Sequence, residues 1–112
     1  MAIRRGSTPI LTVTVIGEDL TQSEVYLTIR QGETLLTKKT PSEDASIWMV
    51  KDGDNTVISA VLSQEETLAF NNGSSVVQIR WVEEDGTAHV SDIGTIILTD
   101  VLLKGVIEYG ND

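Results

Sequence analysis

The chain has 112 residues, no cysteine and a net charge of −9 at neutral pH. This length fits one domain, and the lack of cysteine excludes disulfide bonds and thiolate metal sites. An acidic surface repels phosphate backbones, so we expect no nucleic-acid partner.

Strand patterns dominate the first 62 residues. The segments LTVTV and VYLTI alternate apolar and polar residues, as half-buried strands do. A turn at 31–33 and an Asp-Gly turn at 51–55 are typical of hairpins. Strands are therefore predicted at 11–15, 25–29, 34–40, 47–50 and 56–62.

The periodicity changes at Ser63. Ser63 followed by Glu66 is a capping box, in which each residue satisfies a backbone N–H of the other. We expect a short helix at about 64–70, ended by the NNG sequence that follows. Glu65 and Glu66 could also be an acid/base pair, but adjacent helical residues point about 100° apart. Capping and the helix dipole explain both residues, so the structural interpretation is favoured.

The last predicted strands are 76–82 and 88–98, joined by a second Asp-Gly turn. Gly94 inside the final strand suggests a bulge or bend. This pattern predicts a single all-β domain over residues 1–112. We expect an immunoglobulin-like antiparallel β-sandwich of six to eight strands with one short helical turn. The expected core residues are Leu11, Val13, Val15, Val25, Leu27, Ile29, Ile58, Leu62, Val77, Ile79 and Trp81.

The sequence offers little for catalysis or metal binding. His89 is the only histidine, and on a strand its neighbours Ser91 and Asp92 do not both face it. The 52–55 turn holds two aspartates and an asparagine, but it lacks the glycine and glutamate positions of a calcium loop. No GxSxG, Walker A, GxGxxG or HExxH motif occurs. We therefore predict no enzyme, no catalytic residue, no metal site and no cofactor.

Both ends of the chain are candidates for protein contacts. The N-terminal arm, residues 1–8, carries Arg4 and Arg5, which could meet an acidic face of a neighbouring copy. The apolar C-terminal segment, 101–112, is either the last strand or short helix of its own domain or a strand added to a neighbouring subunit. Its candidate interaction residues are Val101, Leu102, Leu103, Val106 and Ile107. No apolar run reaches the roughly 18 residues of a membrane helix and no signal peptide is apparent, so we expect a cytosolic product and no membrane partner.

Several segments carry a resemblance to a known group of proteins. They are the RG before the first strand, EDLTQSEVYLTIRQGE, LSQEETLAF, VQIRWVEEDGTAHVSDIGTI and VLLKGVI. Over nearly its whole length the chain resembles small uncharacterised proteins encoded in phages and prophages of Gram-positive bacteria. More loosely, its first third is similar to the N-terminal domain of phage baseplate upper proteins, which is also a β-sandwich.

The resemblance implies a non-enzymatic structural or assembly module of a phage particle, associated with the tail or baseplate. Such a module acts through contacts with itself, as a homo-oligomer, or with other virion proteins. It would reside in the host cytoplasm during assembly and then in the virion. The alternative is a β-sandwich that binds carbohydrate or a host surface, with Tyr26 and Trp48 as the ligand-facing aromatic residues.

Overall fold

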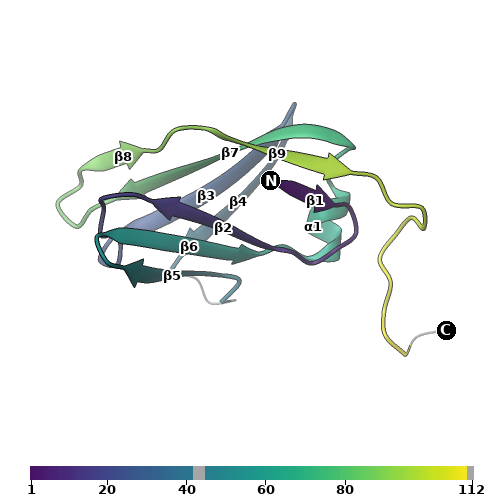
Figure 1. The fold of residues 1–112 in the computed structure, drawn as a ribbon, viewed down its shortest axis with the longest axis horizontal. Coiled ribbons are helices and arrows are strands. Elements are labelled where there is room, and N and C mark those ends of the chain that lie inside the picture. The colour runs from purple at the N-terminus through teal and green to yellow at the C-terminus, as the bar shows by residue number, and fades with distance from the viewer. Residues whose placement is uncertain (42–44, 111–112) are drawn as a thin grey trace.

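Two β-sheets pack face to face in the computed structural model, which describes residues 1–41 and 45–110 (Figure 1). The elements are β1 (Ala2–Arg4), β2 (Ile10–Val15), β3 (Glu24–Gln31), β4 (Thr34–Thr40), β5 (Ile47–Asp52), β6 (Asn55–Val61), α1 (Gln64–Leu68), β7 (Gly73–Val82), β8 (Ala88–Val90) and β9 (Gly94–Thr99). The larger sheet has the order β1-β9-β7-β3-β4, with β8 beside β7, and the smaller sheet has the order β2-β6-β5. This arrangement confirms the predicted all-β sandwich. No helix in the described ranges is long and apolar enough to cross a membrane.

The core lies between the inner faces of the two sheets. Along β3, Val25, Leu27 and Ile29 are at most 2% exposed, because alternate residues of a strand point to the same face. Nine of the eleven expected core residues are buried, which confirms the alternating pattern. Val13 and Val15 are only partly buried, because β2 is an outer strand of the smaller sheet. The buried apolar residues that were not among the expected core residues are Ile3, Leu20, Ile47, Ala60, Phe70, Ile96 and Leu98.

Residues 88–98 form two strands, β8 and β9, and not the single strand predicted. Both pair with β7, and between the two ladders two residues of β7 face the three residues 91–93. This extra residue is a β-bulge, and it directly precedes Gly94, which had suggested one. Ser91 bridges the gap, because its N–H donates to the carbonyl of Ile79 (2.8 Å) and its Oγ accepts from the N–H of Ile79 (3.0 Å).

The N-terminal residues belong to the sandwich, so the prediction of an arm at 1–8 is wrong. Strand β1 pairs in parallel with β9, with Ile3 opposite Leu98, and Ile3 is only 4% exposed. A three-residue strand is too short to display a period. Its partner also lies near the other end of the chain, so only the tertiary structure brings the two together.

Helix α1 begins as predicted and ends earlier. The N–H of Glu66 donates to Ser63 Oγ (3.1 Å), and the N–H of Ser63 donates to Glu66 Oε1 (2.8 Å). These two bonds confirm the capping box. Ala69 caps the C-terminal end of the helix, and the next residue, Phe70, is 2% exposed in the core. The burial of Phe70 accounts for a helix shorter than predicted.

Candidate interaction site at the C-terminus

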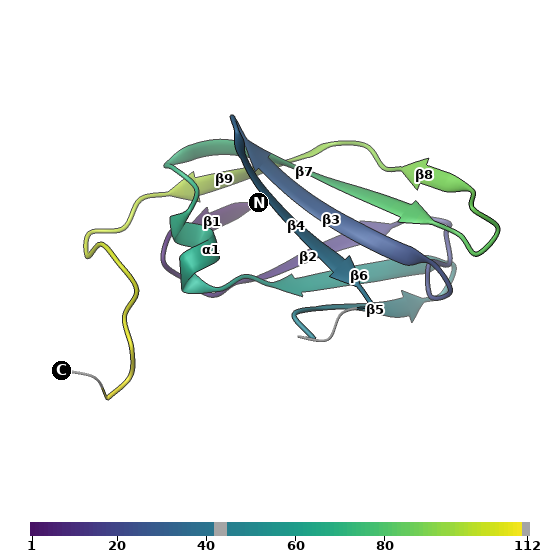
Figure 2. The ribbon, with the colours of Figure 1, turned by 180° about the vertical axis from the view of Figure 1, so that it is seen from behind.

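The C-terminal segment leaves the sandwich at the end where α1 lies (Figures 1 and 2). Its described part, 101–110, forms neither a strand nor a helix, so the alternative that it is the last element of its own domain is wrong. Val101 is partly buried at the base of the segment. The apolar side chains beyond it face solvent: Leu102 and Tyr109 are fully exposed, and the exposed fractions of the others are 69% for Leu103, 47% for Val106 and 60% for Ile107.

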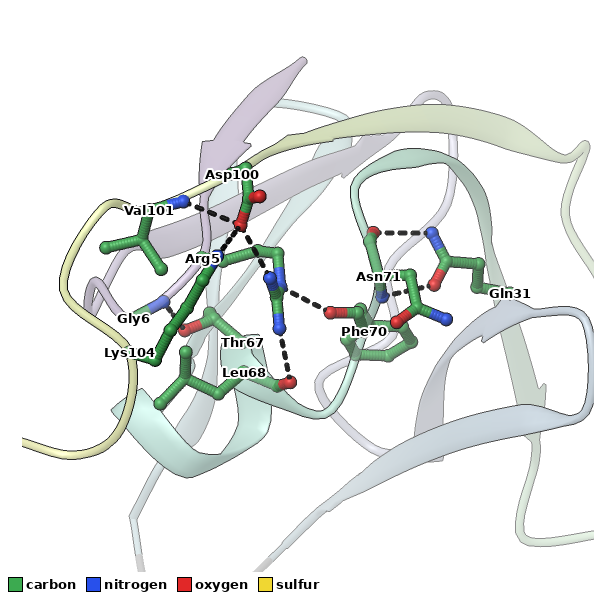
Figure 3. Close-up of polar contacts among 10 residues, drawn as sticks. All are labelled: Arg5, Gly6, Gln31, Thr67, Leu68, Phe70, Asn71, Asp100, Val101 and Lys104. Carbon is green, nitrogen blue, oxygen red and sulfur yellow. Dashed lines mark hydrogen bonds and ion pairs between the residues drawn. The ribbon is translucent and has the colours of Figure 1, made fainter.

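Arg5 holds the base of this segment within its own chain (Figure 3). Its guanidinium donates to the carbonyl oxygens of Phe70 (2.6 Å) and Leu68 (3.2 Å), and it pairs with the carboxylate of Asp100 (2.7 Å). The two carbonyls lie at the C-terminal end of α1, where orphan carbonyls favour a cation. Arg5 therefore uses these donors inside the molecule, and its contact with a neighbouring copy stays a prediction. Arg4 is exposed.

Asp100 gathers three donors on one carboxylate oxygen. Its Oδ1 accepts from Lys104 Nζ (2.6 Å), from the N–H of Val101 (2.8 Å) and from Arg5. The hydrogen bond from Lys104 is the main reason that the pKa of Asp100 is lowered to about 2. The N–H of Val101 and, less strongly, Arg5 lower this pKa further, and burial opposes them. The charged carboxylate thus fixes the direction in which the chain leaves β9.

Replacing Lys104 by methionine should raise the pKa of Asp100 from about 2 toward its ordinary value of 3.8, because the strongest donor is lost. The folded-state pKa lies below the unfolded one, so Asp100 stabilises the fold above about pH 4, and this contribution disappears as the pH falls through about 2. NMR titration of the Asp100 carboxyl carbon measures the midpoint. Lys39→Met, which removes the partner of Glu24, should leave that midpoint unchanged. An unchanged midpoint in Lys104→Met would contradict the contact.

Gln64 holds the segment at a second point. Its side-chain Nε2 donates to the carbonyl of Ile107, and its Oε1 accepts from the N–H of the same residue, both at 2.9 Å. One amide side chain therefore binds the two backbone groups that a neighbouring β-strand would otherwise bind. Nothing in the local sequence links Gln64 to a residue so far along the chain, and the contact was not predicted.

Polar contacts hold α1 in place beside the segment. Thr67 is fully buried; its Oγ1 accepts from the N–H of Gly6 (2.9 Å) and donates to the carbonyl of Ser7 (2.9 Å). On the other side of the helix, Gln31 binds both backbone groups of Asn71, at 2.6 Å and 2.8 Å (Figure 3). Helix α1 and the residues after it are thus attached to the N-terminal residues and to the end of β3.

The two candidate acidic sites have structural contacts. Glu66 caps α1 with one carboxylate oxygen and pairs with Lys38 on β4 through the other (3.1 Å). In the 52–55 turn, the side-chain oxygen of Asn55 accepts from the N–H of Gly17 (2.9 Å). Within residues 1–41 and 45–110, no group of three or more histidine, cysteine or acidic side chains is placed to hold a metal ion.

His89 lies at the edge of the larger sheet. Its ring stacks on Trp81, with 5.1 Å between the ring centroids, and its Nε2 is 3.0 Å from a carboxylate oxygen of Glu83. The Ser91 hydroxyl is used by the backbone, where it accepts from Ile79 and donates to the carbonyl of Asp92 (2.9 Å). These contacts give each group a role in the hairpin and the bulge.

The candidate ligand-facing aromatics do not form one platform. Tyr26 is on the outer face of the larger sheet, with the Lys39 ammonium 5.5 Å from its ring centroid. Trp48 is 38% exposed on the smaller sheet and follows the buried Ile47, so it points to the opposite side of the sandwich. A glycan bound at one of these aromatics would not touch the other.

Comparisons with protein-family models and with curated proteins found no match to the chain. The resemblance to phage proteins therefore stays a hypothesis drawn from the sequence.

Proposed function

We propose that the chain is a non-enzymatic structural or assembly module of a phage particle, associated with the tail or baseplate, and that it acts through its C-terminal segment. The observation that carries the protein-contact part is the exposure of five large apolar side chains outside the sandwich. The phage part rests on the resemblance described above, and it implies residence in the host cytoplasm during assembly and afterwards in the virion.

The exposed segment differs from scattered apolar surface. Residues 102–109 hold five apolar side chains in eight positions, and none of them packs into the core. Contiguous apolar surface of this kind marks sites of protein contact, because covering it contributes about 25 cal/mol per Å² removed from water. The contacts of Arg5, Asp100 and Gln64 hold the backbone of the segment beside α1 and leave its apolar side chains uncovered, where a second protein can reach them.

Deleting residues 101–112 should abolish self-association and leave the domain folded, because every strand in the part of the chain that the structure describes lies before Asp100. Sedimentation velocity at several concentrations measures association, and circular dichroism with thermal unfolding measures the fold. A full-length chain that stays monomeric at every concentration would contradict self-association. A truncated chain that unfolds would show that the segment belongs to its own core.

A further inference from the structure

An apolar groove runs between the two sheets along the free side of β2. One part of the groove has a volume of about 320 Å³, and a second part of about 470 Å³ continues it toward Trp81. Val13 lines both parts, so the groove follows most of the strand. The apolar residues of the first part include Met1, Leu11, Val13, Val77, Ile79 and Ile96.

The groove is open because the smaller sheet ends at β2. This strand pairs with β6 on one side, and no strand in the described part of the chain pairs with its other side. An edge strand presents unpaired N–H and C=O groups that can accept a further strand. Val13 and Val15 are only partly covered, and Ile93 of the bulge, which lines the first part of the groove with Val13, is 62% exposed. One added strand would pair with β2 and cover these side chains.

The C-terminal segment has the pattern such a strand requires. In an extended chain, successive side chains alternate between faces. One face of the segment then carries Leu103, Ile107 and Tyr109 with Gly105 between them and no charge, and the other face carries both Lys104 and Glu108. Gly105 has a positive φ of 91° in the free segment, and glycine also adopts extended conformations readily. Nine residues span about 30 Å as a strand, which exceeds the length of β2.

The segment cannot easily occupy the groove of its own chain. Both views place β1 between the end of β9 and β2, so the segment would have to cross β1 to return (Figures 1 and 2). Arg5 and Asp100 also direct it away at its base. Each copy therefore presents an uncovered apolar segment and an open groove at the same time.

We infer that the C-terminal segment of one copy adds as a strand to β2 of a second copy, with Leu103, Ile107 and Tyr109 in the groove. This inference rests on the proposed function and names the surface that receives the segment. On docking, the backbone N–H and C=O of Ile107 give up their hydrogen bonds to the Gln64 side chain and form hydrogen bonds with β2 of the second copy.

The first test compares the two faces of the segment. The double variant Leu103→Asp/Ile107→Asp should raise the dissociation constant of self-association at least about 100-fold, because two apolar side chains are lost from the groove. The matched variant Leu102→Asp/Val106→Asp has the same charge change on the outward face and should raise it less than about threefold. Sedimentation velocity measures both. Equal effects of the two variants would overturn the assigned face.

The second test mixes two blocked chains. Val13→Asp blocks the groove and leaves the segment intact, and Leu103→Asp/Ile107→Asp does the reverse. Each chain should be monomeric alone, and the mixture should form a 1:1 complex. Failure of the mixture to associate, with both chains folded by circular dichroism, would overturn the inference.

A cysteine pair keeps the test valid if Val13→Asp does not fold. The chain has no cysteine, and Thr14 is exposed at the edge of β2. Mixed Thr14→Cys and Val106→Cys chains should form a disulfide-linked heterodimer under mild oxidation. Absence of this heterodimer would contradict the inference.

If deletion of residues 101–112 abolishes association while the groove variants have no effect, the groove is not the binding surface and the proposed function stands. If the full-length chain never associates with itself, the inference fails, and the proposed function then applies only to contacts with other virion proteins.

Discussion

Leu27→Ala should lower the free energy of unfolding by about 3–5 kcal/mol, the range found for a leucine whose removal leaves a cavity in a rigid core. Leu27 is fully buried on β3, a strand with neighbours on both sides, and it lies opposite Ile79. A domain of this size has a stability of about 5–15 kcal/mol, so a fifth or more of it would be lost. Urea denaturation followed by circular dichroism measures the change.

Leu35→Ala is the matched control for this substitution. Leu35 lies on β4, the strand next to β3, and is 62% exposed. The same chemical change there should alter the free energy of unfolding by less than about 0.5 kcal/mol. Similar losses in the two variants would mean that the inner face of the larger sheet has been assigned incorrectly.

Arg5→Met should lower the free energy of unfolding by about 2–4 kcal/mol, since hydrogen bonds from a charged donor contribute about 1.5–3 kcal/mol each. The carbonyls of Phe70 and Leu68 would lose their donor, and Asp100 would lose one of its cations. The aliphatic part of methionine keeps most of the packing of the arginine stem. Urea denaturation at neutral pH measures the loss.

The neighbouring arginine serves as the control. Arg4 is exposed, and Arg4→Met should change the free energy of unfolding by less than about 0.5 kcal/mol. Arg5→Lys should recover only part of the stability, because an ammonium lacks the planar fork that reaches three divergent acceptors. Equal stability of the Arg4→Met and Arg5→Met proteins would be incompatible with the contacts at the base of the C-terminal segment.

These two sets of substitutions act on different parts of the molecule. Leu27 belongs to the core shared by both sheets, and its loss should affect folding without a specific effect on assembly. Arg5 connects the end of α1 to Asp100, so its loss should also free the direction of the C-terminal segment. Comparing the self-association of Arg5→Met and Leu27→Ala under conditions where both are folded would separate the two roles.

Local sequence determines much of the sandwich. The segments 25–29 and 76–82 alternate apolar and polar residues with period 2, so most of the apolar side chains of each strand lie on one face. These strands and most of their core residues could therefore be predicted. The capping box of Ser63 and Glu66 is equally local, because its two hydrogen bonds join residues three apart. Such patterns act over a few residues and need no knowledge of the rest of the chain.

Contacts between distant residues were decided by the tertiary structure alone. The pairing of β1 with β9, and the bonds of Arg5 to Phe70 and Asp100, join segments that no pattern connects. From the sequence, an arginine near a chain end is interpreted as part of an exposed arm, because the carbonyl and carboxylate groups that accept its hydrogen bonds are not yet known. The bulge at 91–93 was suggested by one glycine, but its place follows from the register of β7.

The candidate site was predicted in part. The apolar composition of 101–107 identified the C-terminal segment as a candidate for protein contacts. Composition does not distinguish a strand that packs in its own core from one that binds another subunit. Only the fold decides this, because β1 takes the free edge of β9 and leaves the segment outside. The open side of β2 also depends on the complete fold. Only the strand order shows that β2 lies at the edge of its sheet.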